Sequence, residues 1–248
     1  MNSAIMKYLY IFPHPDDESF GPAAGMHQQL RQGHEVHLLT LTKGGATQQR
    51  QRLGLSIDEM GEVRHQEMLA VQQTLGLTSM TVLDLPDSGL KHMDPRELEE
   101  VVRYQIERLR PDIVVSYPVH GISGFHDHLV MHAVIKRLYL QMLDEGVGYL
   151  KRLAFFTVPD GGGPAIETNG FRLKQSLPEE IDCILELNEE NIDAMKRALA
   201  CYATYQETIE RSGVVELIGS RLHFEIFNET HQPALSDLAA ALPAVHRE

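Results

Sequence analysis

Short apolar runs alternate with helical patterns along most of this chain, and this alternation limits its fold more than any other feature. The apolar runs are rich in Leu, Val, Ile and aromatic residues, as expected of buried strands, and lie at 7–12, 35–42, 81–87, 112–118 and 152–158. Helical patterns lie between them at 21–32, 58–75, 94–109 and 127–143, with Asp94 as an N-cap ahead of Pro95. Strands that alternate with helices predict an α/β fold with a Rossmann-like, doubly wound, mostly parallel sheet.

The C-terminal part of the chain is less regular. It predicts strands at 181–187 and 222–227 and one long helix at 189–209. The segment 43–57 has no sustained period and is expected to be a mobile loop, while the DGGGP sequence at 160–164 lacks the pattern of a phosphate-binding loop. Because 248 residues with 43% apolar content suffice for one sizeable core, we expect residues 1–248 to form a single domain.

The charge of the chain argues against polyanionic partners. The net charge is −13, which disfavours binding to nucleic acid or to anionic membranes. No apolar run approaches the roughly 18 residues that cross a bilayer, and the apolar stretch near the N-terminus is too short for a signal peptide. Two cysteines, Cys183 and Cys201, do not make a disulfide framework. The sequence therefore predicts a cytoplasmic protein with a small-molecule partner.

Two segments rich in potential metal ligands follow predicted strands. PHPDDE at 13–18 comes after the first strand, and HGISGFHDH at 120–128 follows the fourth. Because ligands of open α/β sheets gather at the carboxyl ends of strands, the two segments are expected to meet at one edge. One histidine and one aspartate from the first with one histidine from the second would make an open, catalytic type of metal site. The other of the two adjacent aspartates would be free to act as a general base.

A strand followed by PHPDDE, with Asp-His after the fourth strand, resembles the PIG-L/LmbE-like N-acetylglucosaminyl deacetylases, which include bacillithiol- and mycothiol-type deacetylases. The resemblance covers most of the chain, with weaker matches at LTKG (41–44), GEVRHQEM (61–68), DLPDSGL (84–90), KRALACYATYQ (196–206) and HFEIF (223–227). It implies that His14, Asp17 and His128 bind the metal. It also implies Asp16 as the base, Arg64 in contact with substrate, and Glu67 and Asp87 lining or supporting the pocket.

The activity that the resemblance implies is a metal-dependent removal of an N-acetyl group from an N-acetylglucosamine-type sugar conjugate. Zinc is the expected metal, with iron(II) as the alternative, and a low-molecular-weight thiol precursor of the bacillithiol type is the expected substrate. Water activated by the metal would attack the amide carbonyl with help from Asp16. The resemblance also allows for a homo-oligomer.

Three positions depart from the family pattern. Phe125 stands where the family commonly has the histidine that protonates the leaving amine. His126 is the first candidate to supply that proton and His120 the second, with Asp127 helping to hold an imidazole in its charged form. Gly45 and Ala203 replace an acidic residue and a histidine that the family often has, which bears on substrate preference more than on metal binding.

Simpler interpretations stand beside these. His14 could be an ordinary turn residue before an acidic helix start, and Arg64 and Glu67 could form a surface pair at i, i+3. His132, four residues after His128, is expected to be packed or solvated. The rival functions are a mononuclear iron(II) oxygenase, which uses the same type of ligand set, and a metal-containing sugar-binding module without turnover, which Phe125 would explain.

Overall fold

The central element of the structure, a computed structural model that describes residues 5–163, 165–168 and 170–242, is a seven-stranded sheet. Its strands run in the order β3-β2-β1-β4-β5-β9-β8, and β1 to β5 are parallel while β9 is antiparallel to both neighbours. The strands are β1 (Lys7–Phe12), β2 (Glu35–Thr42), β3 (Ser79–Leu85), β4 (Ile113–Ser116), β5 (Arg152–Thr157), β8 (Cys183–Glu186) and β9 (Arg221–Ile226). The predicted doubly wound, mostly parallel sheet is confirmed.

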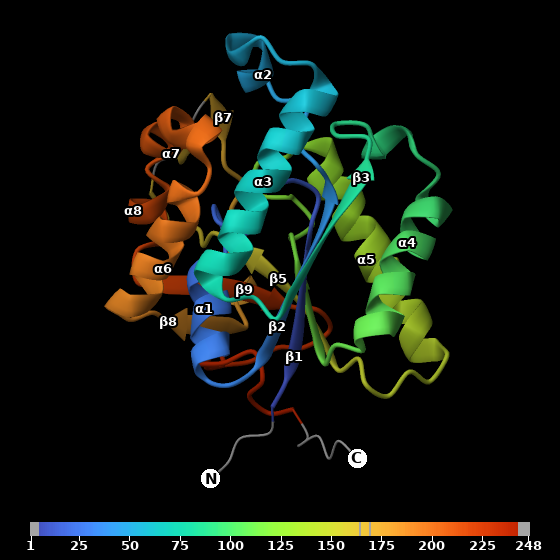
Figure 1. Cartoon of the computed structure of the whole chain (residues 1–248). Helices are drawn as coiled ribbons and strands as arrows, with labels where there is room; N and C mark the ends of the chain where they lie inside the picture. The colour runs from blue at the N-terminus through green and yellow to red at the C-terminus, as the bar shows by residue number, and fades with distance from the viewer. Residues whose placement is uncertain (1–4, 164, 169, 243–248) are drawn as a thin grey trace.

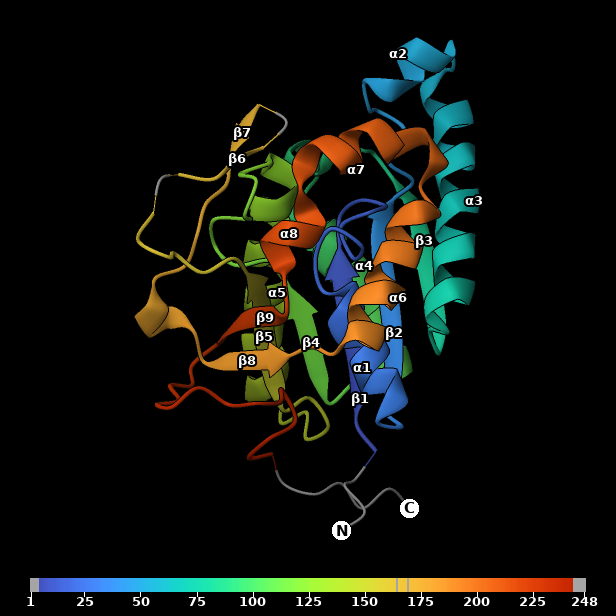
Figure 2. The same ribbon diagram turned by 90° about the vertical axis from the view of Figure 1, so that its left-hand side faces the viewer.

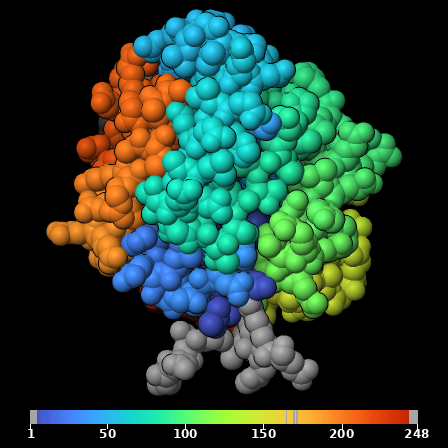
Figure 3. All heavy atoms as spheres, viewed as in Figure 1, coloured from blue at the N-terminus to red at the C-terminus, as the bar shows by residue number. Residues whose placement is uncertain are grey.

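Helices cover both faces of this sheet (Figure 1). One face carries α1 (Ala23–Arg31), α3 (Ile57–Leu75) and α6 (Glu189–Ala200), and the other carries α4 (Pro95–Leu109) and α5 (His126–Asp144). Each face has its own buried apolar cluster, because residues that alternate along a strand point to opposite sides of the sheet: Tyr8 and Tyr10 belong to the first cluster, Leu9 and Ile11 to the second. Figure 3 shows α3 forming a continuous surface beside the C-terminal helices.

Two predicted segments differ in the structure. The expected loop at 43–57 contains a short helix, α2 (Gln49–Leu53), which has no buried residue and ends at Gly54 in the left-handed conformation. The expected long helix at 189–209 is broken, because α6 ends at Ala200 and is followed by the 3-10 turn η3 (Ala203–Tyr205) and α7 (Gln206–Ser212). The break turns the fully buried side chain of Tyr202 toward the carboxyl edge of the sheet.

Smaller elements complete the carboxyl edge of the sheet. They are α8 (Val214–Ile218), the two-stranded hairpin β6 (Glu167–Thr168) and β7 (Phe171–Arg172), and the 3-10 turns η1 (Leu90–His92) and η2 (Pro178–Glu180). In the described part of the DGGGP sequence, no helix begins at the glycines 161–163. Pro164 of that sequence and residues 1–4 lie outside the described residues. None of the helices in the described ranges has the length and apolar character that crossing a bilayer demands.

Candidate metal and catalytic site

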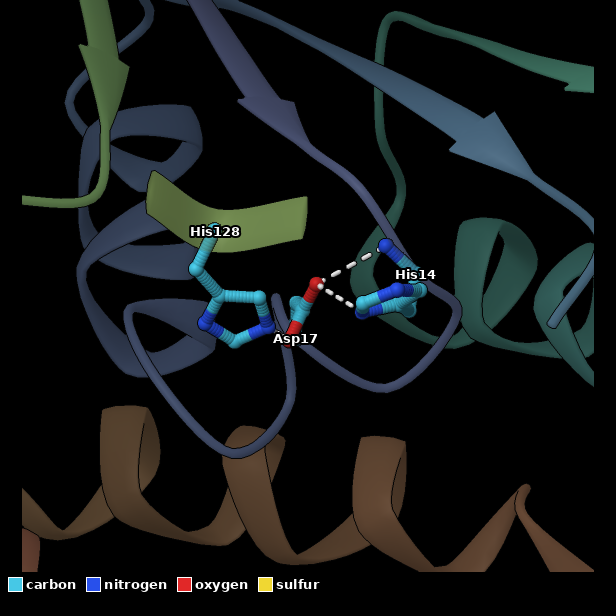
Figure 4. Close-up of side chains that lie close together, drawn as sticks. All are labelled: His14, Asp17 and His128. Carbon is cyan, nitrogen blue, oxygen red and sulfur yellow. Dashed lines mark hydrogen bonds and ion pairs between the residues drawn. The ribbon is translucent and has the colours of Figure 1, made fainter. Parts of the chain in front are cut away.

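Three predicted ligands converge at the carboxyl edge of the sheet. His14 and Asp17 lie on the loop that follows β1, and His128 lies in the first turn of α5. Each offers one ligand atom, and these atoms all lie within 4.8 Å of one another. Figure 4 shows the Asp17 carboxylate between the two imidazole rings. The backbone N–H of His14 donates to Asp17 Oδ2 at 2.8 Å, and this bond fixes the loop around the cluster.

The environment of His128 fits a bound cation. Its Nδ1 must carry the proton, because it donates to the carbonyl oxygen of Gly121 at 2.9 Å. Its Nε2 then presents a lone pair only 3.4 Å from Asp17 Oδ1, and this buried nitrogen has no hydrogen-bond partner among the described residues. Burial lowers the pKa of His128, so the ring resists a second proton. Two facing acceptors in a buried place are stabilised when a metal ion lies between them.

His14 also faces a second pair of carboxylates. Its Nε2 lies 3.1 Å from Asp127 Oδ2 and 3.4 Å from Asp87 Oδ1, and these three residues form a second group of metal-ligating geometry. Burial alone would lower the pKa of His14, but the hydrogen bonds to Asp127 and Asp17 raise it to about 10. The carboxylates around His14 therefore hold positive charge at this point, as a proton when no cation is bound.

Asp16 has a strained backbone that the surroundings stabilise. Its φ angle is +77°, in a region that residues other than glycine rarely adopt. Its N–H donates to the Tyr202 hydroxyl at 2.8 Å, and its carbonyl oxygen accepts from the N–H groups of Ser19 and Phe20, both at 2.8 Å. Burial raises the pKa of the Asp16 carboxyl to about 6, although the neighbouring Arg64 opposes this rise. The carboxyl is thus suited to exchange a proton near neutral pH.

Arg64 and Glu67 on α3 are both buried and both engaged in contacts within the protein. Arg64 donates to Asp16 Oδ2 at 2.5 Å and to the carbonyl oxygen of Pro15 at 2.9 Å, and its guanidinium lies 4.1 Å from the ring centre of Tyr205. The Glu67 carboxylate accepts from the N–H and hydroxyl of Thr204, at 2.8 and 3.0 Å. Arg64 lines the cavity described below, whereas Glu67 lies behind it and supports the turn η3.

The candidates for the proton donor lie in different places. His126, the first residue of α5, and Phe125 before it both line the cavity, and the rings of Phe125 and His128 are nearly perpendicular, with centroids 5.5 Å apart. His120 is not among the residues that line the cavity. Both of its ring nitrogens contact other groups: Nε2 lies 3.1 Å from the Ser176 hydroxyl, and Nδ1 accepts from the N–H of Ile122. His132 also lies outside the cavity and bonds the carbonyl oxygen of Tyr117 through Nδ1.

Two tyrosines that the sequence analysis did not single out complete the site. Tyr117, just after β4, donates to Asp17 Oδ1 at 2.8 Å and stacks on the His128 ring with centroids 4.2 Å apart. Tyr202 donates to Glu18 Oε1 at 2.7 Å while it accepts from Asp16. In the sequence both resemble core residues of a strand and a helix. Only the position of Tyr117 at the carboxyl end of a predicted strand could have indicated a role.

A cavity of about 790 Å³ adjoins the cluster and is lined by His14, Asp16, Asp17, Asp87, Asp127 and His128 together with apolar residues. Fold and cluster together define an α/β protein with a candidate mononuclear metal site at the carboxyl edge of its sheet. The sequence profile of the PIG-L family, described as GlcNAc-PI de-N-acetylase, matches residues 9–139, more than half of the chain. The chain belongs to this family.

Similar proteins carry related names. A 1D-myo-inositol 2-acetamido-2-deoxy-alpha-D-glucopyranoside deacetylase from Kineococcus radiotolerans is 31% identical over 170 residues, which cover 57% of this chain and 47% of the relative. A probable N-acetyl-alpha-D-glucosaminyl L-malate deacetylase 2 from Bacillus subtilis is 28% identical over 136 residues, covering 53% and 60%. The matched region thus spans about half the length of the first of these relatives and somewhat more of the second.

Solved structures share the fold at low sequence identity. The hydratase GalB from Pseudomonas putida has a TM-score of 0.70 at 14% identity, covering 91% of this chain and 97% of the other. The zinc-inhibited form of the teicoplanin deacetylase Orf2 has a TM-score of 0.68, also at 14% identity, covering 89% and 97%. Because a hydratase and a deacetylase share this architecture, the activity has to be argued from the site.

Proposed function

We propose that this protein is a metal-dependent hydrolase that removes the N-acetyl group from an N-acetylglucosamine-type sugar conjugate. The observation that carries the proposal is the buried His14–Asp17–His128 cluster with the Asp16 carboxyl beside it, on one cavity wall. The names of the relatives support an N-acetylated sugar as substrate. A low-molecular-weight thiol precursor of the bacillithiol type is the pathway candidate, and a cytoplasmic location and a homo-oligomer complete the proposal.

His14, Asp17 and His128 would hold the metal, and zinc is the proposed ion because two imidazoles and a carboxylate with open positions suit it. Iron(II) is the alternative. When bound, the ion supplies Lewis acidity and lowers the pKa of water. The second group, His14 with Asp87 and Asp127, has one imidazole and two carboxylates, a harder donor set that suits zinc less well. In the proposal Asp127 therefore orients His14 through the 3.1 Å contact with its Nε2.

The protein's own residues would move the protons. Arg64 binds Asp16 Oδ2, so Oδ1 is left to accept a proton from the attacking water. Because burial raises the pKa of Asp16 to about 6, the carboxyl is ionised at neutral pH and still basic enough to take that proton. His126 lines the same cavity and is the proposed donor to the leaving amine, while Arg64 and Asp87 on the cavity wall are proposed to contact or orient the sugar, with Glu67 in support.

The test is acetate release from N-acetylglucosamine conjugates by protein with a measured metal content. We expect wild-type protein loaded with zinc to release acetate, and Asp16→Asn to lose about 10²-fold or more of kcat while retaining the metal. Asp193→Asn, on the exposed side of α6, is the matched control and should behave as wild type. Loss of the metal from His14→Ala or His128→Ala is also expected. Metal retained in both variants would contradict the proposed ligand set.

The alternative functions predict different results in the same assay. A sugar-binding module without turnover, favoured by Phe125 at the usual acid position, would bind the conjugate without releasing acetate. An oxygenase would turn over only with iron(II) and oxygen. A loss of kcat in His126→Ala with the metal retained would support His126 as the donor; an unchanged kcat would exclude it.

A further inference from the structure

Polar and apolar side chains both line the cavity beside the metal cluster. The loops after β2 and β3 contribute the polar side chains of Thr47, Gln49 and Lys91, and the hairpin and α7 add Thr168 and Arg211. An apolar wall comes from β5, from α8 and from the segment after the β6–β7 hairpin: Phe156, Val158, Leu173, Val214, Leu217 and Ile218. None of these six takes part in the proposed chemistry.

Sheet order places part of the apolar wall next to the cluster. The strands run β3-β2-β1-β4-β5, and the metal cluster follows the two central strands, β1 and β4. Phe156 on β5 and Val158 just after it therefore lie on the β5 side of the cluster. A ligand whose acetamide is held at the cluster can extend along this wall.

Packing holds much of the apolar wall in place. Val214 and Ile218 are buried and belong to the same core cluster as Phe156, so they hold fixed positions. Leu217 and Leu173 are partly exposed and can contact a ligand directly. The hydroxyl of Thr168 on the hairpin donates to the carbonyl oxygen of Ser212 at 3.0 Å, which ties the hairpin to the end of α7, two residues before α8. Figure 2 shows the hairpin and α7 at the same end of the molecule, with α8 below α7 near the ends of the central strands.

We infer that the substrate carries an apolar aglycone, an alkyl or aryl group attached to the acylated sugar in place of the polar aglycone of a thiol precursor, and that this group binds between α8, β5 and the segment after the hairpin. This inference rests on the proposed function for the position of the sugar. A cavity of 790 Å³ is near the upper end of the range of about 300–1,000 Å³ for small-molecule sites, so it has room for more than one sugar ring. A polyhydroxylated aglycone would lose hydrogen bonds to water against this wall.

Calorimetric binding to zinc-loaded protein tests the inference separately from turnover. The ligands are the methyl, butyl and hexyl glycosides of glucosamine, which lack the acetyl group and cannot be hydrolysed at it. Each buried methylene contributes about 0.8 kcal/mol, roughly a fourfold gain in affinity. Because the wall is partly open to solvent, we expect the hexyl glycoside to bind about tenfold more tightly than the methyl glycoside.

Variants on two separate elements remove the wall. Leu217→Asp on α8 and Leu173→Asp after the hairpin should each abolish the dependence on chain length, because the alkyl group would meet a carboxylate. Both side chains are partly exposed, so a melting curve shows whether each variant is folded, and either one suffices for the test. Leu140→Asp, at a 44% exposed position on α5 outside the cavity, is the control and should keep the wild-type dependence.

The outcomes separate this inference from the proposed function. Equal affinity for the methyl and hexyl glycosides, or an unchanged chain-length dependence in both folded variants, would overturn the apolar subsite even if acetate is released from the methyl N-acetylglucosaminide. Chain-length dependence that the variants abolish would establish the subsite even if no acetate is released from any glycoside, and in that case the hydrolase proposal alone fails.

Discussion

Tyr202 connects the strained backbone of Asp16 to a buried acid. Its hydroxyl accepts from the Asp16 N–H and donates to Glu18 Oε1, so one oxygen satisfies two groups beneath the metal cluster. Burial raises the pKa of Glu18 to about 7, so this carboxyl depends strongly on its few hydrogen bonds. The hydroxyl therefore positions Asp16 without contact with substrate.

Tyr202→Phe tests this positioning role. Removal of the hydroxyl leaves the Asp16 N–H without its acceptor and leaves Glu18 Oε1 with the Ser19 hydroxyl as donor, and we expect a loss of about 1–3 kcal/mol in the free energy of unfolding. If Asp16 is the base, kcat should fall while KM changes little, because the substrate contacts are kept. Urea denaturation and steady-state acetate release measure both. Tyr104→Phe, at a 63% exposed position on α4, is the control. An unchanged kcat would reject the positioning role.

The two free cysteines should differ in reactivity. Burial, with a contribution from Asp237, raises the pKa of Cys183 to about 12, while Cys201 is partly exposed. Because only the thiolate reacts, about one Cys183 in ten thousand is reactive at pH 8, and a rise to pH 9 leaves that fraction small. A thiol reagent at pH 8 should therefore label Cys201 in the native protein and both residues after unfolding. Native Cys201→Ser should react slowly; rapid labelling of that variant would contradict the burial argument.

At the scale of elements, the loop from β2 to α3 explains one departure from the family pattern. Gly45 stands where the family often has an acidic residue, and a Cβ atom there would lie 2.1 Å from the carbonyl oxygen of Ile57, the first residue of α3. No side chain fits unless the start of α3 moves. The nearby Asp87 carboxylate accepts from the N–H of Ala46 and so holds this loop against the site.

Gly45→Glu should displace the loop or the first turn of α3. We expect a loss of about 1–3 kcal/mol in the free energy of unfolding, the usual range when a group is forced into a packed region. Gly148→Glu is the control, because a Cβ atom at Gly148 meets nothing within 4 Å. Thermal or urea denaturation of both variants decides the matter. Equal free energies of unfolding for the two variants would mean that the start of α3 can move without loss of stability.

Sequence patterns predicted the helices and strands well where apolar runs or helix caps determine their bounds. The strands β1 and β2 lie at the residues that their apolar runs indicated, and α4 begins with the expected cap, in which the Asp94 side chain accepts from the N–H of Arg96. The break after Ala200 was missed because apolar residues continue at helical spacing past it. It is caused by the burial of Tyr202 against the distant Glu18, which no local pattern records.

In the site, too, some features follow from the sequence pattern and others depend on contacts between distant segments. The two ligand-rich segments were predicted to meet because both follow strands of one parallel sheet, and the family resemblance implied His14, Asp17 and His128 as the ligands among them. The structure brings these three within reach of one ion. The tyrosines around them have no comparable signal. The buried position of Glu67 behind the cavity follows from its bonds to Thr204, on a segment far away in the sequence.

At the scale of the molecule, Arg152 joins the sheet to the end of the described chain. Its side chain is 1% exposed, binds both Glu229 oxygens at 2.8 and 2.6 Å, and donates to the carbonyl oxygens of Leu238 and Ala240. The side chain therefore anchors the segment after β9 against β5.

Arg152→Ala should leave two carbonyl oxygens without a donor and the partly exposed Glu229 carboxylate with only its contact to His231. We expect a loss of about 1–3 kcal/mol in the free energy of unfolding, because the two carbonyl oxygens lose their hydrogen-bond donor. Arg152→Lys should recover little, because one ammonium group cannot bind both Glu229 oxygens and the two carbonyls. Arg221→Ala removes an exposed pair with Glu186 and should lose less than about 1 kcal/mol. Equal losses in the two alanine variants would refute the anchoring role.

The order of the strands places the candidate catalytic residues and the apolar wall of the cavity in different parts of the chain. All three candidate ligands and the proposed base precede residue 129, on the loop after β1 and in the first turn of α5, and the family profile ends at residue 139. The apolar wall of the cavity comes from Phe156 onward, on β5 and the elements after it. Mutation or recombination confined to the second half of such a gene would reshape what the protein recognises while the first half kept its chemistry intact, so diversification of substrates in proteins of this design need not pass through inactive intermediates.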